Sequence, residues 1–423
     1  MKKVAIIGGG AAGMMCAATL LENMPSTEPL SVALFDKNTK LGVKVLISGG
    51  GRCNVTTGIT DKKILLTKYI RWSDFLKPSL SSFPPQKVKA RFENHGVPLK
   101  IEEDLRVFPV SDDGKDIVGI FEKLFSESNS LENYLGHWVI SIKKNDKNFI
   151  LTLDDNTTQT VDILVIATGG NAYAKTGSSG DGYEFARQLG HSITPLGPSL
   201  NSFLSAQQRP KNLSGLSLPS AKLETSLFSG EKKSVTWPML FTHFGISWPA
   251  VFALSAYLSK EEISAQSPQK IFLTIDSSRY FHDREKDLIS LFQAHPAKQI
   301  NSILGNFFPD RLVEEICKAC EISTTQKVSS ITKDQRKAVC HLLTGSREIN
   351  LTARRPWDEF VTAGWVSLSE ISSKKLESLI CPDLYFAGEV MDIDGVTGWF
   401  NLQSSRATGR QAWLSILEKL SIN

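Results

Sequence analysis

The sequence is poor in cysteine, in net charge and in long apolar runs. Its 6 cysteines, at positions 16, 53, 317, 320, 340 and 381, are too scattered for a disulfide scaffold, which favours a reducing cytosol. The 48 lysines and arginines exceed the 44 aspartates and glutamates by only 4, so we expect neither nucleic acid nor a membrane surface as a partner. No run of about eighteen apolar residues occurs, so we expect no transmembrane helix. The prediction is a cytoplasmic protein.

Internal repeats and low-complexity tracts are also missing. A second G-x-G-x-x-G in a strand–helix setting is absent, so we expect no dedicated NAD(P)H domain, although NAD(P)H can still bind transiently. At 423 residues, with 41% hydrophobic and 22% charged residues, the chain has the composition of a globular protein of two or three domains. The sequence leaves the oligomeric state open.

The first 36 residues have the pattern of a dinucleotide-binding βαβ unit. The apolar run Val4–Ile7 predicts a buried parallel strand, and residues 8–13 then read G-x-G-x-x-G. A helix is expected from Ala11 to about Glu22, and a second strand, Val32–Phe35, ends at Asp36. A strand before the glycines, a helix after them and an acid at the end of the second strand together make this motif specific.

Each residue of this motif has a physical role. Gly8 allows the tight turn, Gly10 lets the backbone approach a pyrophosphate, and Gly13 lets helix and strand pack closely. The helix N-terminus offers free N–H groups and partial positive charge to the phosphates. Asp36 is placed to accept hydrogen bonds from a ribose. The alternative is a glycine-rich turn that binds nothing.

A second glycine-rich segment, Ser48–Asn54, contains three consecutive glycines. Such a run suits a backbone that passes close to a flat ligand, with a chance flexible loop as the alternative. Arg52 is a candidate for a phosphate contact and Asn54 for a ring edge. Flavin disulfide reductases have a second cysteine five residues after the first. Position 58 is glycine here, so we expect Cys53 to pack beside the cofactor, with a reactive thiol as the minority interpretation.

The remaining chain predicts an α/β fold interrupted by an insertion. Apolar strands at 163–166 and 384–387 each end in a glycine turn, as strands that border ligand crevices do. Between them the α/β rhythm lapses into short alternating strands and then helices at about 281–343. Ser247 is expected to cap a helix over 248–258. The predicted domains are 1–190 and 356–423 for the dinucleotide-binding part and 191–355 for an inserted β-barrel with a helical subdomain.

Five motifs together resemble one bacterial family, the BaiN-like FAD-dependent oxidoreductases, which include enzymes described as aminoacetone oxidases. The motifs are GGGAAG, ISGGGRCNVT, ATGG…TGSSGDGY, FTHFGIS and FAGEVMDIDGVTGWFNLQ, and they extend over nearly the whole chain. The resemblance implies a Rossmann-like, glutathione-reductase-like FAD domain split by the insertion. It implies cofactor contacts from Gly8, Gly10, Ala12, Gly13, Asp36, Lys37, Lys44, Ser48, Gly50, Gly51, Arg52, Cys53, Asn54, Val139, Thr168, Gly169, Gly388, Glu389, Asp394, Gly395, Asn401, Leu402 and Gln403.

The sequence departs from the family pattern at three tryptophans. Trp248, Trp365 and Trp399 stand where the family usually has glycine. Residues 404–408 read SSRAT where the family usually carries an aromatic pair. A tryptophan adds roughly 150–250 Å² of surface at such a site, so the departures bear on the substrate pocket more than on FAD.

Candidate catalytic residues are fewer. His243 lies in a matched motif before a helix, and histidine is suited to proton transfer near neutral pH, with a hydrogen-bonded structural histidine as the alternative. Tyr173 is a candidate pocket residue. Cys317, Cys320, Cys340 and His341 lie in helical patterns, and we expect no metal site from them.

The sequence thus predicts an FAD-dependent oxidoreductase acting on a small organic substrate, at a C=C, C–N or amine centre. NAD(P)H or O₂ is the candidate redox partner. One alternative is an FAD-binding protein with little turnover and a binding or regulatory role. A minor alternative is a flavin-dependent tRNA-modifying enzyme, disfavoured by the small net charge.

Overall fold

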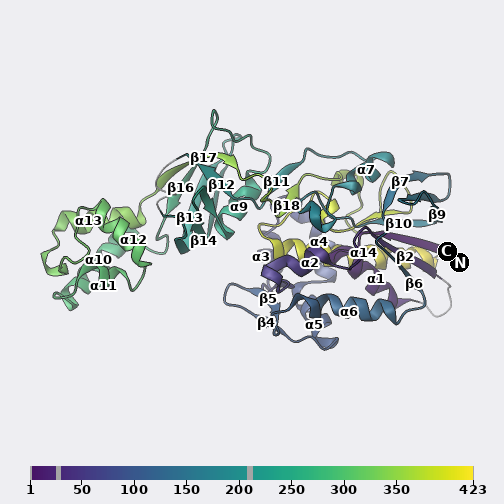
Figure 1. Cartoon of the computed structure of the whole chain (residues 1–423), viewed down its shortest axis with the longest axis horizontal. Helices are drawn as coiled ribbons and strands as arrows, with labels where there is room; N and C mark the ends of the chain where they lie inside the picture. The colour runs from purple at the N-terminus through teal and green to yellow at the C-terminus, as the bar shows by residue number, and fades with distance from the viewer. Residues whose placement is uncertain (1, 25–29, 207–212, 423) are drawn as a thin grey trace. The chain divides into compact units, whose positions relative to one another are not determined.

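The computed structural model describes residues 2–24, 30–206 and 213–422. The chain divides into two compact units, of which unit 1 is Met1–Pro198 with Phe360–Asn423 and unit 2 is Ser199–Glu359 (Figure 1). Unit 1 is therefore built from both ends of the chain. The sequence pattern had placed these boundaries at 190/191 and 355/356.

Unit 1 is built on a parallel sheet of five strands in the order β19-β10-β1-β2-β6. Every neighbouring pair runs parallel, and β1 pairs with β2 on one side and β10 on the other. The chain therefore moves outward from β1 in both directions, and the loops after β1 and β10 diverge at a crevice. This confirms the predicted Rossmann-like sheet. The strands are β1 (Lys2–Ile7), β2 (Leu30–Asp36), β6 (Leu131–Leu135), β10 (Ile163–Ile166) and β19 (Leu384–Phe386).

Two helices from opposite ends of the chain pack beside each other in unit 1. They are α1 (Ala11–Asn23) and α14 (Gly398–Ile422), and a Cβ on Gly409 would lie 2.2 Å from the carbonyl oxygen of Ala12, so glycine permits this contact. Around them lie α2 (Val43–Ile47), α3 (Lys62–Leu66), α4 (Ser73–Ser82), α5 (Pro85–Asn94), α6 (Gly114–Ser126) and α7 (Asp181–Gln188). The short 3-10 turns include η1 (Ser48–Gly51) and η5 (Gly388–Val390).

Unit 1 also contains two three-stranded antiparallel sheets. One has the order β3-β5-β4 and the other β7-β8-β9. Their strands are β3 (Thr56–Thr57), β4 (Leu99–Ile101), β5 (Arg106–Pro109), β7 (Val139–Lys144), β8 (Phe149–Leu153) and β9 (Thr158–Val161). The β4–β5 hairpin reaches the glycine-rich segment, since β5 pairs with β3 and Val55 N–H donates to the carbonyl of Val107.

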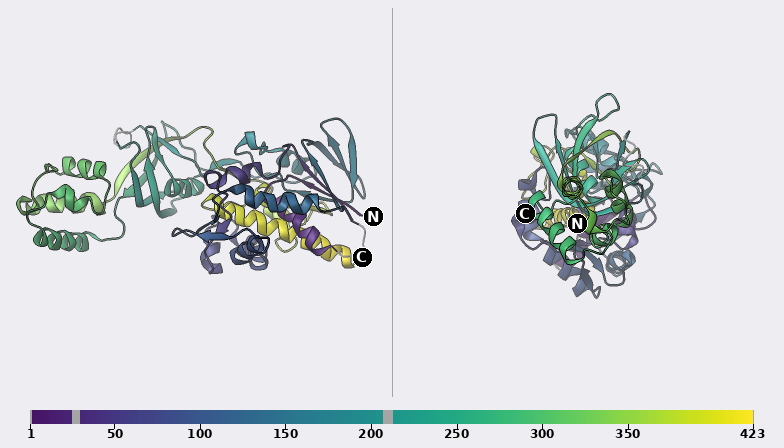
Figure 2. Two further views of the ribbon diagram at one scale, coloured as in Figure 1. Left: turned by 60° about the horizontal axis from the view of Figure 1, so that its bottom comes forward. Right: turned by 90° about the vertical axis from the view of Figure 1, so that its left-hand side faces the viewer.

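Unit 2 is a closed six-stranded barrel with a helical part, as the sequence predicted for the insertion. Its strand order is β12-β15-β14-β13-β16-β17, and the four helices α10 to α13, inserted between β16 and β17, gather at one end of the barrel (Figure 2). The strands are β12 (Phe203–Ser205), β13 (Ser217–Ser226), β14 (Lys232–Phe241), β15 (Gly245–Ser247), β16 (Gln269–Thr274) and β17 (Arg347–Arg354). The helices are α9 (Pro249–Tyr257), α10 (Phe281–Ala294), α11 (Ile300–Leu304), α12 (Asp310–Ala319) and α13 (Lys333–Thr344).

One continuous apolar core joins the barrel to its helices. It includes Phe203 and Leu273 from strands, Leu254 from α9 and Ile316 from α12, all at most 3% exposed. No helix in the described ranges is long and apolar enough to cross a bilayer.

One expected helix start was wrong. Ser247 does not cap α9, because it belongs to β15 and its hydroxyl lies 2.8 Å from that of Ser202. The helix begins at Pro249, whose fixed φ suits a first turn, and Trp248 occupies the cap position.

Candidate cofactor and active site

The N-terminus of α1 is open and uncapped. No side chain caps it and no acid lies in its first turn, so its first N–H groups are available to an anion. A Cβ on Gly10 would meet nothing within 4 Å, whereas one on Gly13 would lie 1.8 Å from the Gly8 carbonyl oxygen. Gly13 therefore closes the turn, and Gly10 leaves space before the helix. This arrangement fits the pyrophosphate of a dinucleotide.

Asp36 is held at the end of β2 by backbone donors. Its Oδ2 accepts from Gly9 N–H at 2.6 Å and its Oδ1 from Asn38 N–H at 2.7 Å. The carboxylate is only partly exposed and is fixed beside the glycine turn, where a ribose diol would meet it. Its neighbour Lys37 contacts Asp181 and Ser179, so this amine joins β2 to the start of α7.

Segments from distant parts of the chain meet at the start of α1. Lys44 Nζ lies 2.9 Å from Glu389 Oε2 and joins α2 to η5. A Cβ on Gly388 would lie 2.7 Å from the Cβ of Ala12. Thr168 Oγ1 and Glu389 Oε1 are buried without a hydrogen-bond partner, as expected for polar atoms that await a ligand or water. A Cβ on Gly8 would lie 2.9 Å from Thr168 Cα, so Ala12, Thr168, Gly169, Gly388 and Glu389 lie around the glycine turn before α1.

The segment Ser48–Asn54 presents bare backbone. Gly49, Gly50 and Gly51 have φ values of 61°, 73° and 93°, which glycine adopts at little cost. A Cβ on Gly50 or Gly51 would meet nothing within 4 Å, and one on Gly49 would lie 2.7 Å from the Phe108 ring. The loop therefore rests on Phe108 and offers an open face that suits a flat ring.

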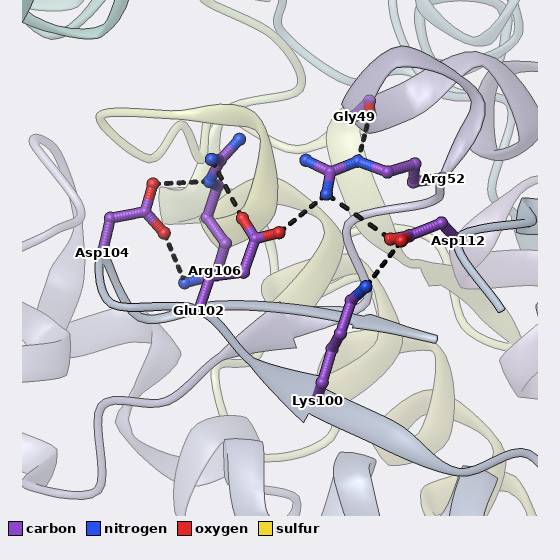
Figure 3. Close-up of polar contacts among 7 residues, drawn as sticks. All are labelled: Gly49, Arg52, Lys100, Glu102, Asp104, Arg106 and Asp112. Atoms are coloured by element: carbon purple, nitrogen blue, oxygen red, sulfur yellow. Dashed lines mark hydrogen bonds and ion pairs between the residues drawn. The ribbon is translucent and has the colours of Figure 1, made fainter. Parts of the chain in front are cut away.

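Arg52 fastens this loop to the β4–β5 hairpin (Figure 3). Its guanidinium lies 2.7 Å from Glu102 and 3.4 Å from Asp112, and 3.8 Å above the Phe108 ring. The hydrogen bond that Arg52 donates to Glu102 raises the pKa of Arg52, and the one that Lys100 donates to Asp112 lowers the pKa of Asp112. Alternating charges form a chain: Lys100, Asp112, Arg52, Glu102, Arg106 and Asp104. Its charges cancel, so Arg52 is engaged by carboxylates rather than presented to a phosphate.

Cys53 and Arg406 form a buried contact beneath the loop. Cys53 is fully buried with φ 58°, and Arg406 Nη2 lies 3.9 Å from its Sγ. Burial raises the pKa of the thiol, opposed by Arg406, and burial lowers the pKa of Arg406. Asn54 Oδ1 is buried nearby in sequence without a partner. Sequence reasoning missed Arg406, and its only signal was the departure from the family pattern at residues 404–408.

The residues expected at the flavin ring are largely engaged within the protein. Asn401 binds Gly395 N–H through its Oδ1 at 3.0 Å, and its Nδ2 donates to the carbonyls of Gly395 and Thr397. Gln403 accepts from Thr56 Oγ1 and donates to the carbonyl of Phe83. These amides shape the loop 394–397 and the start of α14. Leu402 is partly exposed between them.

Asp394 is fully buried and pairs with Arg71, a residue that sequence reasoning missed. Arg71 Nη2 lies 2.5 Å from Asp394 Oδ1, and Ile70 N–H donates to the Asp394 carbonyl. The segment 68–72 thus fixes the loop that the resemblance places at the flavin. No local sequence pattern announces this pairing, because the partners are 323 residues apart.

The two candidate catalytic residues belong to different units. Tyr173 in unit 1 is 39% exposed, and its ring centroid is 5.5 Å from that of Phe360. His243 in unit 2 is exposed and packs edge-on against Phe244 at 5.0 Å. Val139, expected near the adenine, is a buried residue of β7.

The three tryptophans that stand where the family usually has glycine lie in different environments. Trp365 is fully buried, with its ring 4.7 Å from that of Tyr183, and its indole N–H has no hydrogen-bond partner. Trp399 lies in the first turn of α14 with its ring 5.6 Å from Phe400. Trp248 is 42% exposed in unit 2.

The cysteines of the helical part are buried free thiols. Burial raises the pKa of Cys317 and of Cys340 to about 11, which keeps both protonated and unreactive. Within the described residues, no three His, Cys, Asp or Glu side chains are grouped to hold a metal ion.

Comparison with known proteins adds a family. The model of the HI0933-like protein Rossmann domain matches residues 2–414. The chain is 30% identical to a ribosomal RNA dihydrouridine synthase of Escherichia coli K12, over 94% of both chains. It is 29% identical to a ribosomal RNA dihydrouridine synthase of Haemophilus influenzae, over 97% of both. It is 26% identical to a 3-dehydro-bile acid delta(4,6)-reductase of Clostridium scindens, over 99% of this chain and 100% of that protein.

The family match extends over nearly the whole chain, and the open α1 N-terminus, Asp36 and the bare glycine loop fit FAD. The predicted family, fold and enzyme class are confirmed. The chain belongs to the HI0933-like Rossmann family and is an FAD-dependent oxidoreductase.

Proposed function

We propose that this enzyme adds two hydrogens across a carbon–carbon double bond conjugated to a carbonyl, and that its substrate is a uracil ring in ribosomal RNA. The observation that carries the proposal is the similarity, over 94% and 97% of this chain, to two proteins named ribosomal RNA dihydrouridine synthases. A dihydrouridine differs from a uridine by two hydrogens across the ring double bond beside a carbonyl. A 3-dehydro bile acid with double bonds at positions 4 and 6 presents the same kind of conjugated system.

The chemistry requires a hydride at the carbon distant from the carbonyl and a proton at the carbon beside it. Bound FAD, once reduced by NADH or NADPH, would supply the hydride. The α1 N-terminus and the Ser48–Asn54 loop would hold the cofactor, and a side chain of the protein would supply the proton. Tyr173 is the proposed donor, because its side chain is 39% exposed on the loop after Gly169 in unit 1, the unit that contains both glycine-rich segments.

RNA as the substrate differs from the expectation drawn from net charge. That charge is unevenly spread, since residues 199–359 carry 20 lysines and arginines against 16 acids, and the rest of the chain carries 28 of each. The whole excess of 4 positive charges thus belongs to unit 2. Because cationic side chains dominate contacts with phosphates, this distribution supports RNA binding through unit 2.

The test is anaerobic turnover of the purified, FAD-loaded protein with NADH or NADPH and an unmodified ribosomal RNA fragment. Digestion and mass spectrometry would reveal uridines that have gained two hydrogens. We expect Tyr173→Phe to lower kcat while FAD content is retained. A protein that binds no FAD, or whose flavin is reduced by neither donor, would refute the proposal and, in the second case, favour the low-turnover alternative.

A steroid-like conjugated ketone is the second candidate substrate, favoured by the full-length similarity to the bile acid reductase. The same reduced enzyme is mixed with such an enone, and flavin reoxidation is followed by absorbance. Reoxidation by the enone and not by RNA would replace the first candidate with the second.

A further inference from the structure

We propose that one side of the unit 2 barrel, along β15 and the end of β17, is a binding surface for an unpaired RNA nucleotide, formed by His243, Phe244, Trp248, Arg355 and Trp357. We call these five residues the barrel cluster. The inference rests on the proposed function for its choice of RNA. Its chemistry is separate, because it concerns the stacking and orientation of a base and its phosphate rather than reduction.

Two direct contacts hold the centre of the cluster together. The Arg355 guanidinium lies 4.4 Å from the centroid of the Phe244 ring. The His243 ring packs edge-on against the same Phe244 ring, with the two ring centroids 5.0 Å apart. Arg355 also lies 3.6 Å from Asp358, with 46% of its side chain exposed. A flat cation is therefore held over an aromatic ring with most of its donors free to turn outward.

The two tryptophans follow one row of residues at the ends of β15 and β17. Arg355 N–H donates to the carbonyl of Ser202 at 2.9 Å, and the hydroxyls of Ser202 and Ser247 lie 2.8 Å apart. Trp248 follows Ser247 directly and Trp357 follows Arg355 by two residues, and the three-residue strand β15 separates this row from His243 and Phe244. Trp248 is 42% exposed and Trp357 is 95% exposed.

Such exposure has a cost that a binding role would explain. An indole that is 95% exposed leaves nearly all of its apolar surface in water, and Trp248 and Trp357 both have positive φ, at 84° and 61°. Aromatic faces and arginine planes are the side chains that stack with unpaired RNA bases. Arginine donors also match the carbonyl edge of a pyrimidine or a phosphate.

An unpaired nucleotide fits these residues better than a duplex does. A paired base hides its faces within the stack, and duplex RNA is contacted mainly through its backbone and shape. Reduction of a uracil ring also requires that the base leave the stack. The exposed aromatic rings of the cluster therefore favour a single-stranded segment.

The experiment measures anisotropy of a fluorescein-labelled oligouridine of about ten nucleotides with the FAD-loaded, full-length protein. We expect tighter binding of the single strand than of the same strand in a duplex. Trp357→Ala and Phe244→Leu should each weaken binding by roughly 5- to 100-fold. Arg355→Gln should weaken it and reduce the slope of affinity against salt, and Arg355→Lys should restore the slope without the full affinity.

Matched controls are available outside the cluster. Trp138 is 43% exposed and lies in unit 1, and Tyr280 is 83% exposed and precedes α10. Trp138→Ala and Tyr280→Ala should leave binding within about twofold of the unsubstituted protein. Circular dichroism and FAD content confirm that each variant is folded.

Two results would overturn the surface: a wild-type protein that fails to prefer the single strand, or cluster variants that bind as tightly as the controls. Failure of the proposed activity gives a different result from failure of the proposed surface. A protein that binds the single strand through these residues but forms no dihydrouridine supports the surface and refutes the activity. A protein that forms dihydrouridine equally well after Trp357→Ala, with unchanged affinity, supports the activity and refutes the surface.

Discussion

Trp248 has a backbone conformation that is nearly confined to glycine. Its φ is 84° and its ψ is 178°, a region where a Cβ collides with the neighbouring peptide. The residue lies between β15 and α9, and both neighbours are fixed, Ser247 in the strand and Pro249 in the first helical turn. Trp248 therefore has no freedom to relax into an ordinary conformation.

The cost can be isolated by comparing two substitutions rather than each with tryptophan. Trp248→Ala and Trp248→Gly both remove the indole and lose the same packing. Alanine retains a strain of about 1–3 kcal/mol, and glycine removes it while losing about 0.5–1 kcal/mol through the greater freedom of its unfolded chain. The glycine variant should be the more stable by about 0.5–2 kcal/mol, the reverse of the usual order.

The assay is thermal and urea unfolding of the purified variants. For a unit of the length of Ser199–Glu359, the glycine variant should melt roughly 1–8 °C above the alanine variant. Trp138 is the control, since it has similar exposure at 43% and is not among the positive-φ residues. There alanine should be at least as stable as glycine. An alanine variant at 248 that equals or exceeds the glycine variant would refute the strain argument.

Three further predictions concern residues of unit 1. Gly10→Val places a branched side chain in the space before α1, and we expect FAD affinity, measured by equilibrium dialysis, to fall more than about tenfold with little change in secondary structure. Burial lowers the pKa of His191, so its neutral form is favoured in the folded state. The free energy of unfolding should therefore decline as pH falls below about 6.5, the pKa of an unfolded histidine. In His191→Gln, the free energy of urea unfolding should change less between about pH 6.5 and 5 than it does in the unsubstituted protein. Glu102→Gln removes a partly exposed ion pair with Arg52, so stability should fall by less than about 1 kcal/mol, with the difference shrinking in 1 M salt. A larger loss would contradict the solvent-screened character of the network.

The electrostatic contacts of unit 1 differ in what they can contribute. The Arg52 chain lies at the surface, where each pair is worth little, and its value is to hold a loop of three glycines that would otherwise be mobile. Arg71 and Asp394 are different, because Asp394 is fully buried and its carboxylate would lose the 2.5 Å contact with a guanidinium if Arg71 were removed. Stability and the shape of the loop at 394–397 therefore depend on Arg71 more than on Arg52.

The sequence by itself determined the features that local spacing decides. Strand β1, the turn at Gly8 and Gly13, helix α1 and Asp36 follow one another within 36 residues, and each has a steric or hydrogen-bonding reason to be where it is. The alternation of short strands and helices likewise revealed the barrel and its helical part. These predictions needed no knowledge of distant partners.

Only the tertiary structure decided which side chains are free to act. Gln403 lies 347 residues from Thr56 and Lys44 lies 345 residues from Glu389, and no spacing rule relates such positions. The sequence makes Arg52 a candidate for a phosphate contact, but in the structure it pairs with carboxylates of Glu102 and Asp112 at the β4–β5 hairpin. The sequence predicts Ser247 as a helix cap, but in the structure it is the last residue of β15. In each case the side chain is held by hydrogen bonds or ion pairs to residues that become neighbours only in the folded chain. The sequence therefore identified the cofactor, and the structure identified which side chains around its site are already engaged.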